Sequence, residues 1–344
     1  MATRKRRITA QDVAAEARVS RTTVSFVLNN TPGKSIPEAT RQRVLEAAAK
    51  LGYIPNENAQ RLARTRDHHI GLFICHSRYV HSDVYLIRAL EGMSRAANRS
   101  RVRLSVHPVT LRETSYLDLA DKDDVDGLIV MNSHEADPAL QELVRSGLPA
   151  VTMDYLGDMM IDQVYVDNVV AARKVTRHLT GLGHRRIAMI THAPPVYFAS
   201  RKRMDGYGEA LTEAGVQIDA RLVRHADFTE QSGYDQMTRL LQDEPEITAV
   251  FAGNDVVAYG VMQAILESGR TIPDDLSLVG FDDDYMSRFL SPALTTMAMP
   301  ATGHGSASLE TLLARIYGEA AENPVHRLLQ AHLNIRDSTS PPSR

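Results

Sequence analysis

Polar and aromatic side chains that could bind a small molecule recur where predicted strands end. Asp154, Asn254 and Asp282 each come directly after a short run of apolar and β-branched residues. Arg203 opens a predicted helix, and Phe228 lies just after a further apolar run. Carboxylate and guanidinium groups make paired hydrogen bonds to neighbouring hydroxyls, and an aromatic face packs on the C–H surface of a sugar ring. These residue types predict a site for a hydroxyl-rich ligand such as a sugar.

Catalysis would need a further pattern, which the sequence lacks. Asp255 and Asp283 can equally well cap helices on solvated loops, and no two carboxylates are paired at a fixed spacing. Gly181 and Gly183 lie after a helix and before a strand, the reverse of the order that a phosphate-binding loop needs. The sequence has no GxxxxGK[ST], GxSxG or HExxH motif, and its histidines have no strong metal spacing. We expect no enzyme activity, no cofactor and no metal.

The elements that would position these side chains alternate along residues 68–344. Short apolar runs followed by helical stretches predict parallel sheets with helices on both faces, and ligands bind beyond the carboxyl ends of such strands. With about 277 residues this body exceeds the usual limit for one core, so we expect two lobes with the site in the cleft between them. The candidate strands are 70–75, 102–107, 127–131, 150–153, 186–191, 249–253 and 276–281, and the candidate helices are 84–98, 169–182, 203–214, 232–242, 255–268 and 306–317.

A different pattern occupies residues 9–29, TAQDVAAEARVSRTTVSFVLN. It predicts two short helices joined by a tight turn, with Thr9 capping the first and Ser20 capping the second. The outward N-terminal residues of such a second helix can reach base edges in the major groove of DNA. A helical hairpin from some other kind of domain is the alternative. The predicted buried positions are Val13, Ala14, Ala17, Val24, Val27 and Leu28, and the outer face carries Arg21, Thr22, Ser25 and Phe26.

The charge is divided unevenly along the chain. Residues 1–66 hold 13 Lys and Arg against 5 Asp and Glu, a balance of +8, whereas residues 67–344 hold 26 against 37, a balance of −11. A basic head attracts phosphate by counterion release, so its binding should fall steeply with salt. The head also contains a third predicted helix, which begins near Pro37 and ends before Gly52. Its core positions are Val44, Ala47, Ala48 and Leu51.

Motifs along almost the whole chain resemble the lactose-repressor (LacI/GalR) family of bacterial transcription regulators, and they occur in family order. The resemblance implies a small all-α helix-turn-helix head and an α/β, two-lobed, periplasmic-binding-protein-like effector domain of parallel sheets flanked by helices. The matching segments are DVAAEARVSRTTVSFVLN, TRQRVLEAAAKLGYIPNENAQRLA, VDN at 166–168, LTGLGHRRIAMI at 179–190, RMDGY at 203–207, AGNDVVAYGVMQAILESG at 252–269, IPDDLSLVGFDD at 272–283 and SPALTTM at 291–297.

The resemblance implies roles for the outer face of the second helix. Arg21 and Thr22 would contact bases in the major groove, and a third base-reading position falls on Phe26. The lactose repressor has arginine at this third position. Phe26 offers only apolar contact, for example to a thymine methyl, or is partly buried against its own domain. The predicted DNA-binding set of this domain, residues 1–55, is Thr9, Ser20, Arg21, Thr22, Ser25, Phe26 and Asn29.

Residues 56–67 resemble the hinge helix and linker of the family, which become ordered when two copies meet in the minor groove. Leu62 matches the wedge that inserts between base pairs and kinks the duplex. Ala59 matches the position of close approach, and Asn56 matches the helix start that contacts the DNA backbone.

For the effector domain, residues 68–337, the resemblance implies that Arg203 and Asp282 clamp effector hydroxyls. Phe228 would stack on the effector, and Asn254 would add a hydrogen bond. Residues in the loop after the first strand would line the opposite wall. The predicted effector-binding set is Tyr79, Asp83, Tyr85, Asp154, Arg203, Phe228, Asn254 and Asp282.

The remaining features suggest the compartment and the partners. The single Cys75 cannot form an intramolecular disulfide, and no apolar run suits a signal peptide or a membrane span. We expect a cytoplasmic homodimer that binds a near-palindromic double-stranded operator and a small-molecule effector, with no membrane contact and with a disordered tail over residues 338–344. Two alternatives are a solute-binding protein of a transport system, which has no use for a basic head, and a sugar-modifying enzyme, which needs a catalytic motif.

Overall fold

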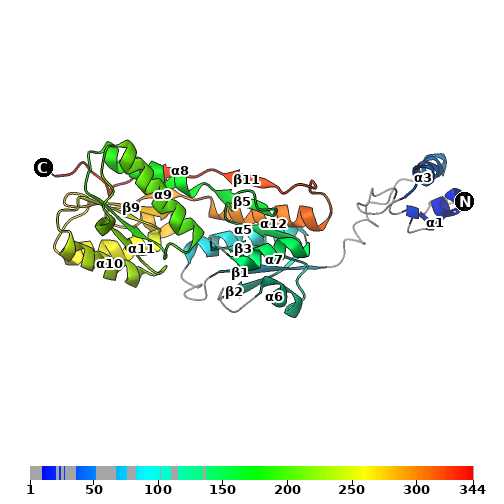
Figure 1. The fold of residues 1–344 in the computed structure, drawn as a ribbon, viewed down its shortest axis with the longest axis horizontal. Helices are drawn as coiled ribbons and strands as arrows, with labels where there is room; N and C mark the ends of the chain where they lie inside the picture. Colours follow the sequence, from blue (N-terminus) through cyan, green and yellow to red (C-terminus); the bar gives the residue numbers. More distant parts are fainter. Residues whose placement is uncertain are drawn as a thin grey trace, which may run out of the picture. The chain divides into compact units, whose positions relative to one another are not determined.

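The structure is a computed structural model with two compact units, Met1–Asp67 and His68–Arg344. Figure 1 shows the fold of each unit. Within the parts of the chain that the structure describes, no helix is long and apolar enough to cross a membrane. The described residues are 10–20, 23–24, 27, 36–51, 67–75, 83–100, 102–109, 115–134 and 137–343.

The first unit contains the helices α1 (Ala10–Ala17) and α3 (Glu38–Leu51). Between them, Ser20 Oγ accepts a hydrogen bond from the amide of Thr23 at 3.0 Å, so the predicted cap of the second helix is confirmed. Arg18 turns the chain with a φ of 54°. The buried core of this unit consists of Val13, Ala14, Ala17, Val24, Val27, Val44, Ala47 and Ala48, all of them predicted core positions. The predicted Leu51 is partly buried against this core, and the predicted Leu28 lies outside the described residues.

The second unit begins with a parallel six-stranded sheet in the order β11-β5-β4-β3-β1-β2. Alternate residues of a strand face opposite sides. Ile70 and Leu72 therefore pack under α5 and α12, while Phe73 packs against α6 and α7 on the other face. The strands are β1 (His68–Ile74), β2 (Val102–Pro108), β3 (Gly127–Met131), β4 (Ala150–Thr152), β5 (Asp162–Val166) and β11 (His326–Leu329), and the helices are α5 (Val84–Ser100), α6 (Tyr116–Lys122), α7 (Pro138–Ser146) and α12 (Ala301–Ile316).

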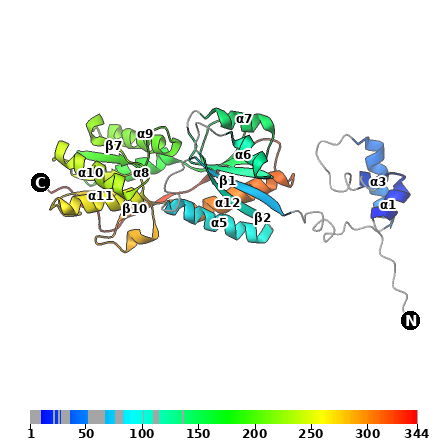
Figure 2. The ribbon, with the colours of Figure 1, turned by 90° about the horizontal axis from the view of Figure 1, so that it is seen from below.

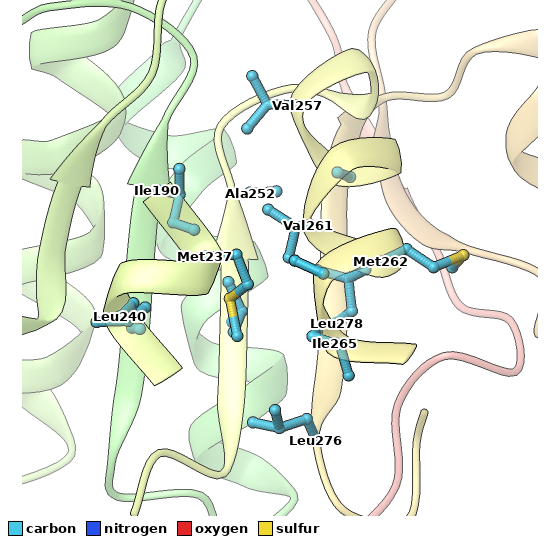
Figure 3. Close-up of a cluster of buried hydrophobic side chains, with 14 of the residues drawn as sticks. Ile190, Met237, Leu240, Ala252, Val257, Val261, Met262, Ile265, Leu276 and Leu278 are labelled. Carbon is cyan, nitrogen blue, oxygen red and sulfur yellow. The ribbon is translucent and has the colours of Figure 1, made fainter. Parts of the chain in front are cut away.

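A second six-stranded sheet, in the order β12-β10-β9-β8-β6-β7, forms the other lobe. It is parallel except for the antiparallel pair of β10 and β12. Figure 3 shows the core between this sheet and two of its helices, where Ile190 and Leu278 meet Met237 and Val261. The elements are β6 (Ile187–Thr191), β7 (Val223–His225), β8 (Ala249–Ala252), β9 (Ser277–Asp282), β10 (Thr295–Ala298), β12 (His332–Asn334), α8 (Asn168–Gly181), α9 (Phe198–Glu213), η2 (Ala220–Leu222), α10 (Glu230–Asp243), α11 (Asp255–Glu267) and η3 (Tyr285–Arg288).

The chain passes between the two lobes three times: after β5, after β10, and between β11 and β12. Figures 1 and 2 show α12 and β11, the late orange and red segments, lying with the early strands of the first lobe. The predicted two-lobed architecture is confirmed. All seven predicted strands and six predicted helices of this unit are present, with ends that differ by up to five residues.

Two predictions about local structure are wrong. α9 begins at Phe198, so Arg203 lies inside this helix and does not open it. The tail over 338–344 is not disordered in its described part: Ser338 is fully buried, and its hydroxyl donates to the Leu278 carbonyl at 2.6 Å and accepts from the Thr295 amide at 2.8 Å. These hydrogen bonds hold the polar tail against β9 and β10, a partnership that its composition does not reveal.

Candidate functional site

A cavity lies between the lobes, where the carboxyl ends of strands from both sheets meet. Its volume is about 50 Å³. Of the predicted effector-binding residues, all seven that the structure describes line it: Asp83, Tyr85, Asp154, Arg203, Phe228, Asn254 and Asp282. The other lining residues are Met131, Asn132, Met153, Val166, Asn168, His192, Ala199, Met299 and His304.

Arg203 is the buried cation of this cavity, with 6% of its surface exposed. Its Nε donates to Asn168 Oδ1 at 3.0 Å, and its Nη1 donates to the carbonyl of Gly253. The guanidinium carbon lies 3.8 Å from the ring centroid of Phe281. Burial lowers the pKa of Arg203, and the nearby carboxylate of Asp282 opposes that shift. These contacts fix the plane of the guanidinium group and leave Nη2 directed toward Asp282.

Asp282 faces Arg203 across the cavity. Its Oδ1 lies 3.9 Å from Arg203 Nη2, which is too far for a hydrogen bond, and this buried oxygen has no hydrogen-bond partner. Burial raises the pKa of Asp282 well above its ordinary value, although Arg203 lowers it. A buried acceptor without a partner costs free energy, so a hydroxyl that donated to Oδ1 would be bound favourably.

Asp154 supplies a second carboxylate, from the first lobe. Its Oδ2 accepts hydrogen bonds from Ser133, at 2.8 Å from the amide and 2.7 Å from the hydroxyl. Burial raises the pKa of Asp154, and the two hydrogen bonds from Ser133 oppose the shift. Asn132, the neighbour of Ser133, has a buried side-chain nitrogen, Nδ2, without a hydrogen-bond partner. The cavity wall therefore offers an unused donor as well as an unused acceptor.

A tyrosine–histidine pair forms part of the first lobe's wall. His304 Nε2 lies 2.6 Å from the carbonyl oxygen of Val164, which can only accept, so the ring proton is on Nε2. His304 Nδ1 is then the acceptor for the hydroxyl of Tyr85, at 2.5 Å. Burial lowers the pKa of His304 to about 4, so the ring is neutral at pH 7. This pairing leaves the lone pairs of the Tyr85 oxygen available to a ligand.

Three lining residues have a positive φ, which residues other than glycine rarely adopt. They are Asn132 with a φ of 59°, Phe228 with 60° and Asp282 with 120°. The amide of Phe228 donates to the carbonyl of His192 at 2.7 Å, and the rings of these two residues meet edge to face at 5.5 Å. Strained backbone of this kind concentrates at functional sites, where the surrounding structure stabilises it.

A close approach of two strands at the end of β8 requires a glycine just before Asn254, one of the predicted effector-binding residues. A Cβ at Gly253 would lie 2.4 Å from the backbone nitrogen of His192, so only glycine allows β6 and β8 to approach here. Asn254 then caps α11, with Oδ1 accepting from the Val257 amide at 2.9 Å. The cap engages the carbonyl of the Asn254 side chain, so its NH₂ group is the part that can serve a ligand.

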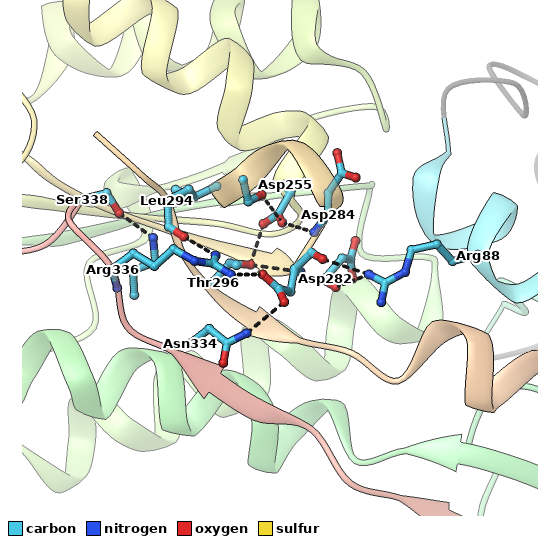
Figure 4. Close-up of polar contacts among 12 residues, drawn as sticks. Arg88, Asp255, Asp282, Asp284, Leu294, Thr296, Asn334, Arg336 and Ser338 are labelled. Atoms are coloured by element: carbon cyan, nitrogen blue, oxygen red, sulfur yellow. Dashed lines mark hydrogen bonds and ion pairs between the residues drawn. The ribbon is translucent and has the colours of Figure 1, made fainter. Parts of the chain in front are cut away.

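Asp255 and Asp283 stabilise the loop that presents Asp282, and neither caps a helix on a solvated loop. Asp255 is buried and accepts hydrogen bonds from the Asp284 amide and the Ser287 and Thr296 hydroxyls, each at 2.6 to 2.7 Å. Asp283 accepts from Asn334 at 2.9 Å and pairs with Arg336 at 2.5 Å. Figure 4 shows this network around Asp282.

Arg88 joins the two lobes beside the cavity. From α5 of the first lobe, its Nη1 donates to the carbonyl of Asp282 at 3.2 Å and to the carbonyl of Asp283 at 2.9 Å (Figure 4). Both acceptors belong to the end of β9 and the residue after it, in the second lobe. The Arg88 side chain can therefore hold the loop that carries Asp282 only while the two lobes are close together.

Several lining residues were not predicted from the sequence, although two of them had a usable signal. Asn132 directly follows β3, and His192 directly follows β6, so the rule that identified Asp154 applies to both. His304 had no such signal, because it lies in α12, which returns to the first lobe from far along the chain. Ten of the predicted contact residues lie outside the described part of the chain: Thr9, Arg21, Thr22, Ser25, Phe26, Asn29, Asn56, Ala59, Leu62 and Tyr79.

Two known sequence families match the chain. Residues 9–56 match the family described as bacterial regulatory proteins, lacI family, and residues 176–339 match the periplasmic binding protein-like domain. Among solved structures, the complex of the transcriptional regulator CelR with cellobiose is similar, with a TM-score of 0.72, 30% identity and coverage of 96% of this chain and 100% of that one. The lac repressor dimer bound to operator and the anti-inducer ONPF has a TM-score of 0.70, at 28% identity over 97% and 100%.

Curated relatives extend over nearly the same length. The HTH-type transcriptional regulator CelR of Thermobifida fusca is 32% identical over 97% of this chain and 99% of its own. The HTH-type transcriptional repressor PurR of Glaesserella parasuis serovar 5 (strain SH0165) is 34% identical over 92% of this chain and 93% of its own. The likeness to known regulators thus extends over nearly the full chain, which belongs to the lacI family of bacterial regulatory proteins.

Proposed function

We propose that this chain is a sequence-specific transcriptional repressor whose affinity for its operator is controlled by a sugar or sugar derivative bound in the interlobe cavity. The observation that best supports a sugar ligand is the pair of Arg203 and Asp282. A buried guanidinium nitrogen and a buried carboxylate oxygen lie 3.9 Å apart. A ligand hydroxyl between them could accept from the guanidinium group and donate to the carboxylate at the same time.

Further features of the wall favour a hydroxyl-rich ligand. Asn132 has a buried donor without a partner, and the oxygen of Tyr85 retains lone pairs after it donates to His304. Phe228 and three methionines, Met131, Met153 and Met299, supply apolar surface for the C–H faces of a ring. The set resembles the usual binding site, which is mostly apolar with a few polar groups that fix the orientation of the ligand.

The cavity volume indicates that ligand exchange requires motion. About 50 Å³ holds only about four water molecules, so a sugar ring enters only if the lobes separate or the wall rearranges. We infer a linkage mechanism: the effector changes the spacing of the lobes, and that spacing determines whether the segment over 56–67 can form the hinge helix. By linkage, operator and effector then alter each other's affinity by the same factor.

For DNA binding we propose the residues that the family resemblance identifies. Arg21 and Thr22 read bases in the major groove, Phe26 reads a third position or packs against its own domain, and Leu62 is the minor-groove wedge. Ala59 gives the close approach beside the wedge. The remaining proposed contacts are Thr9, Ser20, Ser25, Asn29 and Asn56.

We also propose that the chain acts as a homodimer, because a near-palindromic operator matches a two-fold protein. Support comes from an exposed apolar group around η3: Tyr285, Met286 and Phe289 are each at least 49% exposed, and the rings of Tyr285 and Phe289 lie 5.0 Å apart. Clustered exposed apolar side chains often mark a protein interface, and here the occupant we propose is a second copy of this chain.

The two alternative functions are not favoured. A solute-binding protein of transport would share the two lobes but would not need the helix-turn-helix head that residues 9–56 match. The relatives named above are regulators, and no catalytic pattern was found in the sequence. Because a regulator of this kind works on the chromosome, we propose a cytoplasmic location.

The experiment that tests the ligand is a thermal-shift screen of the full-length chain against sugars, sugar derivatives, sugar phosphates and nucleosides. A ligand that binds only the folded protein raises the melting temperature. We expect a sugar or sugar derivative to raise it for the wild type and not for Arg203→Ala. As a matched control, Arg173→Ala removes a partly exposed arginine that pairs with Glu209 and Glu213 on α9, and it should keep the response. A shift that survives Arg203→Ala would place the ligand elsewhere.

A further inference from the structure

A second, larger hollow lies beside the interlobe cavity. This outer groove has a volume of about 680 Å³, which is in the range of about 300 to 1,000 Å³ typical of small-molecule sites. Both lobes contribute to it, since Phe198 and Lys202 come from α9 and the other residues come from the first lobe. On the first lobe's side, the lining residues include His134, Gln141, Glu142, Arg145 and Tyr155.

The inner cavity and the outer groove share the same chain segments. Asp154 lines the cavity and Tyr155 lines the groove; Ala199 lines the cavity and Phe198 lines the groove. The same alternation relates Asn132 to His134 and Arg203 to Lys202. A wall only one or two residues thick therefore separates the two spaces, and one ligand could occupy both if that wall moved.

The wall is a non-covalent contact between the lobes, so it can open without disrupting a helix or a sheet. The amide of Phe198 donates to the carbonyl of Ser133 at 3.0 Å, and His134 forms an isolated antiparallel bridge with Tyr197. The ring of Tyr197 meets that of His134 at 4.7 Å and that of Phe228 at 5.1 Å, both edge to face. Tyr197 thus contacts a residue of the outer groove on one side and a residue of the inner cavity on the other.

The chemistry of the outer groove suits another sugar ring. Tyr155 is 40% exposed, and its ring is supported from below by Tyr165, with centroids 4.6 Å apart and planes tilted by 31°. An aromatic ring that is fixed by packing on one side and exposed on the other can stack against the C–H face of a sugar. Gln141, Glu142 and Arg145 are exposed along α7 at the same groove, where they offer donors and acceptors to hydroxyls.

We propose that the outer groove is a second subsite, which holds the second ring of an effector with two or more sugar units. The first ring lies in the inner cavity, and the linkage between the rings passes where Ser133 and His134 now meet Tyr197 and Phe198. A two-ring ligand would then take the place of the contact between the lobes at this wall. This inference rests on the proposed function, because it assumes that the inner cavity binds a sugar.

The experiment measures binding of matched ligands to the full-length chain. The probes are a panel of monosaccharides, the disaccharides built from them, and nucleosides. Native mass spectrometry identifies the bound species, and calorimetry gives each Kd. We expect a disaccharide to bind about ten-fold or more tightly than either of its single rings, a ratio easily resolved by calorimetry. Tyr155→Ala should remove most of this advantage and leave monosaccharide binding unchanged, while Tyr155→Phe should retain it.

Met160 provides the matched control. It is exposed and follows a residue that lines the groove, but it does not line the groove itself. Met160→Ala should leave both affinities unchanged. The subsite is overturned if a monosaccharide or a nucleoside binds as tightly as any disaccharide, or if Tyr155→Ala weakens one-ring and two-ring ligands equally. Absence of any sugar binding, or sugar binding that Arg203→Ala does not weaken, overturns the proposed function itself.

Discussion

Single residues in the cavity are held by partners that determine their protonation. His304 donates to Val164 and accepts from Tyr85, an arrangement that only the neutral ring allows. Asp282 and Asp154 have raised pKa values because they are buried, yet each has a nearby cation or donor that favours the charged form. The residue scale therefore predicts a dependence of stability on pH whose sign follows from the direction of each shift.

For His304 the expected effect is a loss of stability in acid. Its pKa is about 4 in the folded chain and about 6.5 when unfolded, so between these pH values only the unfolded chain binds the proton. The free energy of unfolding should fall as the pH drops from 6.5 to 4, by about 3 kcal/mol from this residue, and then level off. Chemical denaturation at a series of pH values measures it.

His304→Gln tests the assignment, because glutamine can accept from Tyr85 and donate to Val164 but does not titrate. His107, His134, His178, His184 and His225 also have pKa values lowered by burial, so the variant should keep their share of the slope. An unchanged slope in the variant would contradict the role given to His304.

Gly253 allows a second prediction at this scale. A methyl group there would collide with the backbone of His192, so Gly253→Ala should lower the free energy of unfolding by about 1 to 3 kcal/mol. Gly181, in the last turn of α8, has nothing within 4 Å of its Cβ position, and alanine there should be neutral or stabilising. Equal stability of the two variants would show that β6 and β8 do not approach as closely as described.

At the scale of elements, the strand ends position the cavity and α5 connects it to the other lobe. Arg88→Ala removes the two hydrogen bonds from α5 to the carbonyls of Asp282 and Asp283. Because these contacts exist only when the lobes are close, the variant should weaken effector binding by about ten-fold while leaving Arg203 in place. Calorimetry with the ligand from the thermal screen measures the change.

A control for Arg88 is present in the same helix. Arg95 is exposed and pairs with Glu91 one turn away, so Arg95→Ala should leave effector affinity unchanged. Equal affinities of the wild type and Arg88→Ala would mean that the contact between α5 and β9 does not contribute to closure.

Burial is one reason why some strands could be predicted from the sequence and others could not. The strand at 127–131 was predicted with its observed ends, because it is buried on both faces and reads as a continuous apolar run. β11, with the sequence HRLL, was missed, since it lies at the edge of its sheet with three of four residues exposed. For the cavity, polar residues directly after strands could be predicted, whereas His304 on the returning helix α12 could not, because only the tertiary fold brings it there.

At the scale of the whole molecule, the central questions are assembly and coupling. If Tyr285, Met286 and Phe289 form part of an interface with a second copy, a charge within this group should oppose dimerisation. Phe289→Asp should shift the chain toward monomer in analytical ultracentrifugation at micromolar concentration, because a buried unpaired carboxylate is costly. Ile218→Asp, at an exposed position outside this group, should not do so. A Phe289→Asp chain that remains dimeric would place the interface elsewhere.

The most direct test of the coupling between cavity and head is operator binding with and without the effector. An operator selected from random DNA by the full-length chain would be titrated, by fluorescence anisotropy, with the wild type and with Arg203→Ala. We predict that the effector changes the wild-type operator Kd by five-fold or more, in the range of about 5- to 150-fold for allosteric coupling, and that Arg203→Ala binds the operator normally without responding. An Arg203→Ala chain that responds like the wild type, or a wild type whose operator affinity ignores a ligand bound in the cavity, would contradict the mechanism.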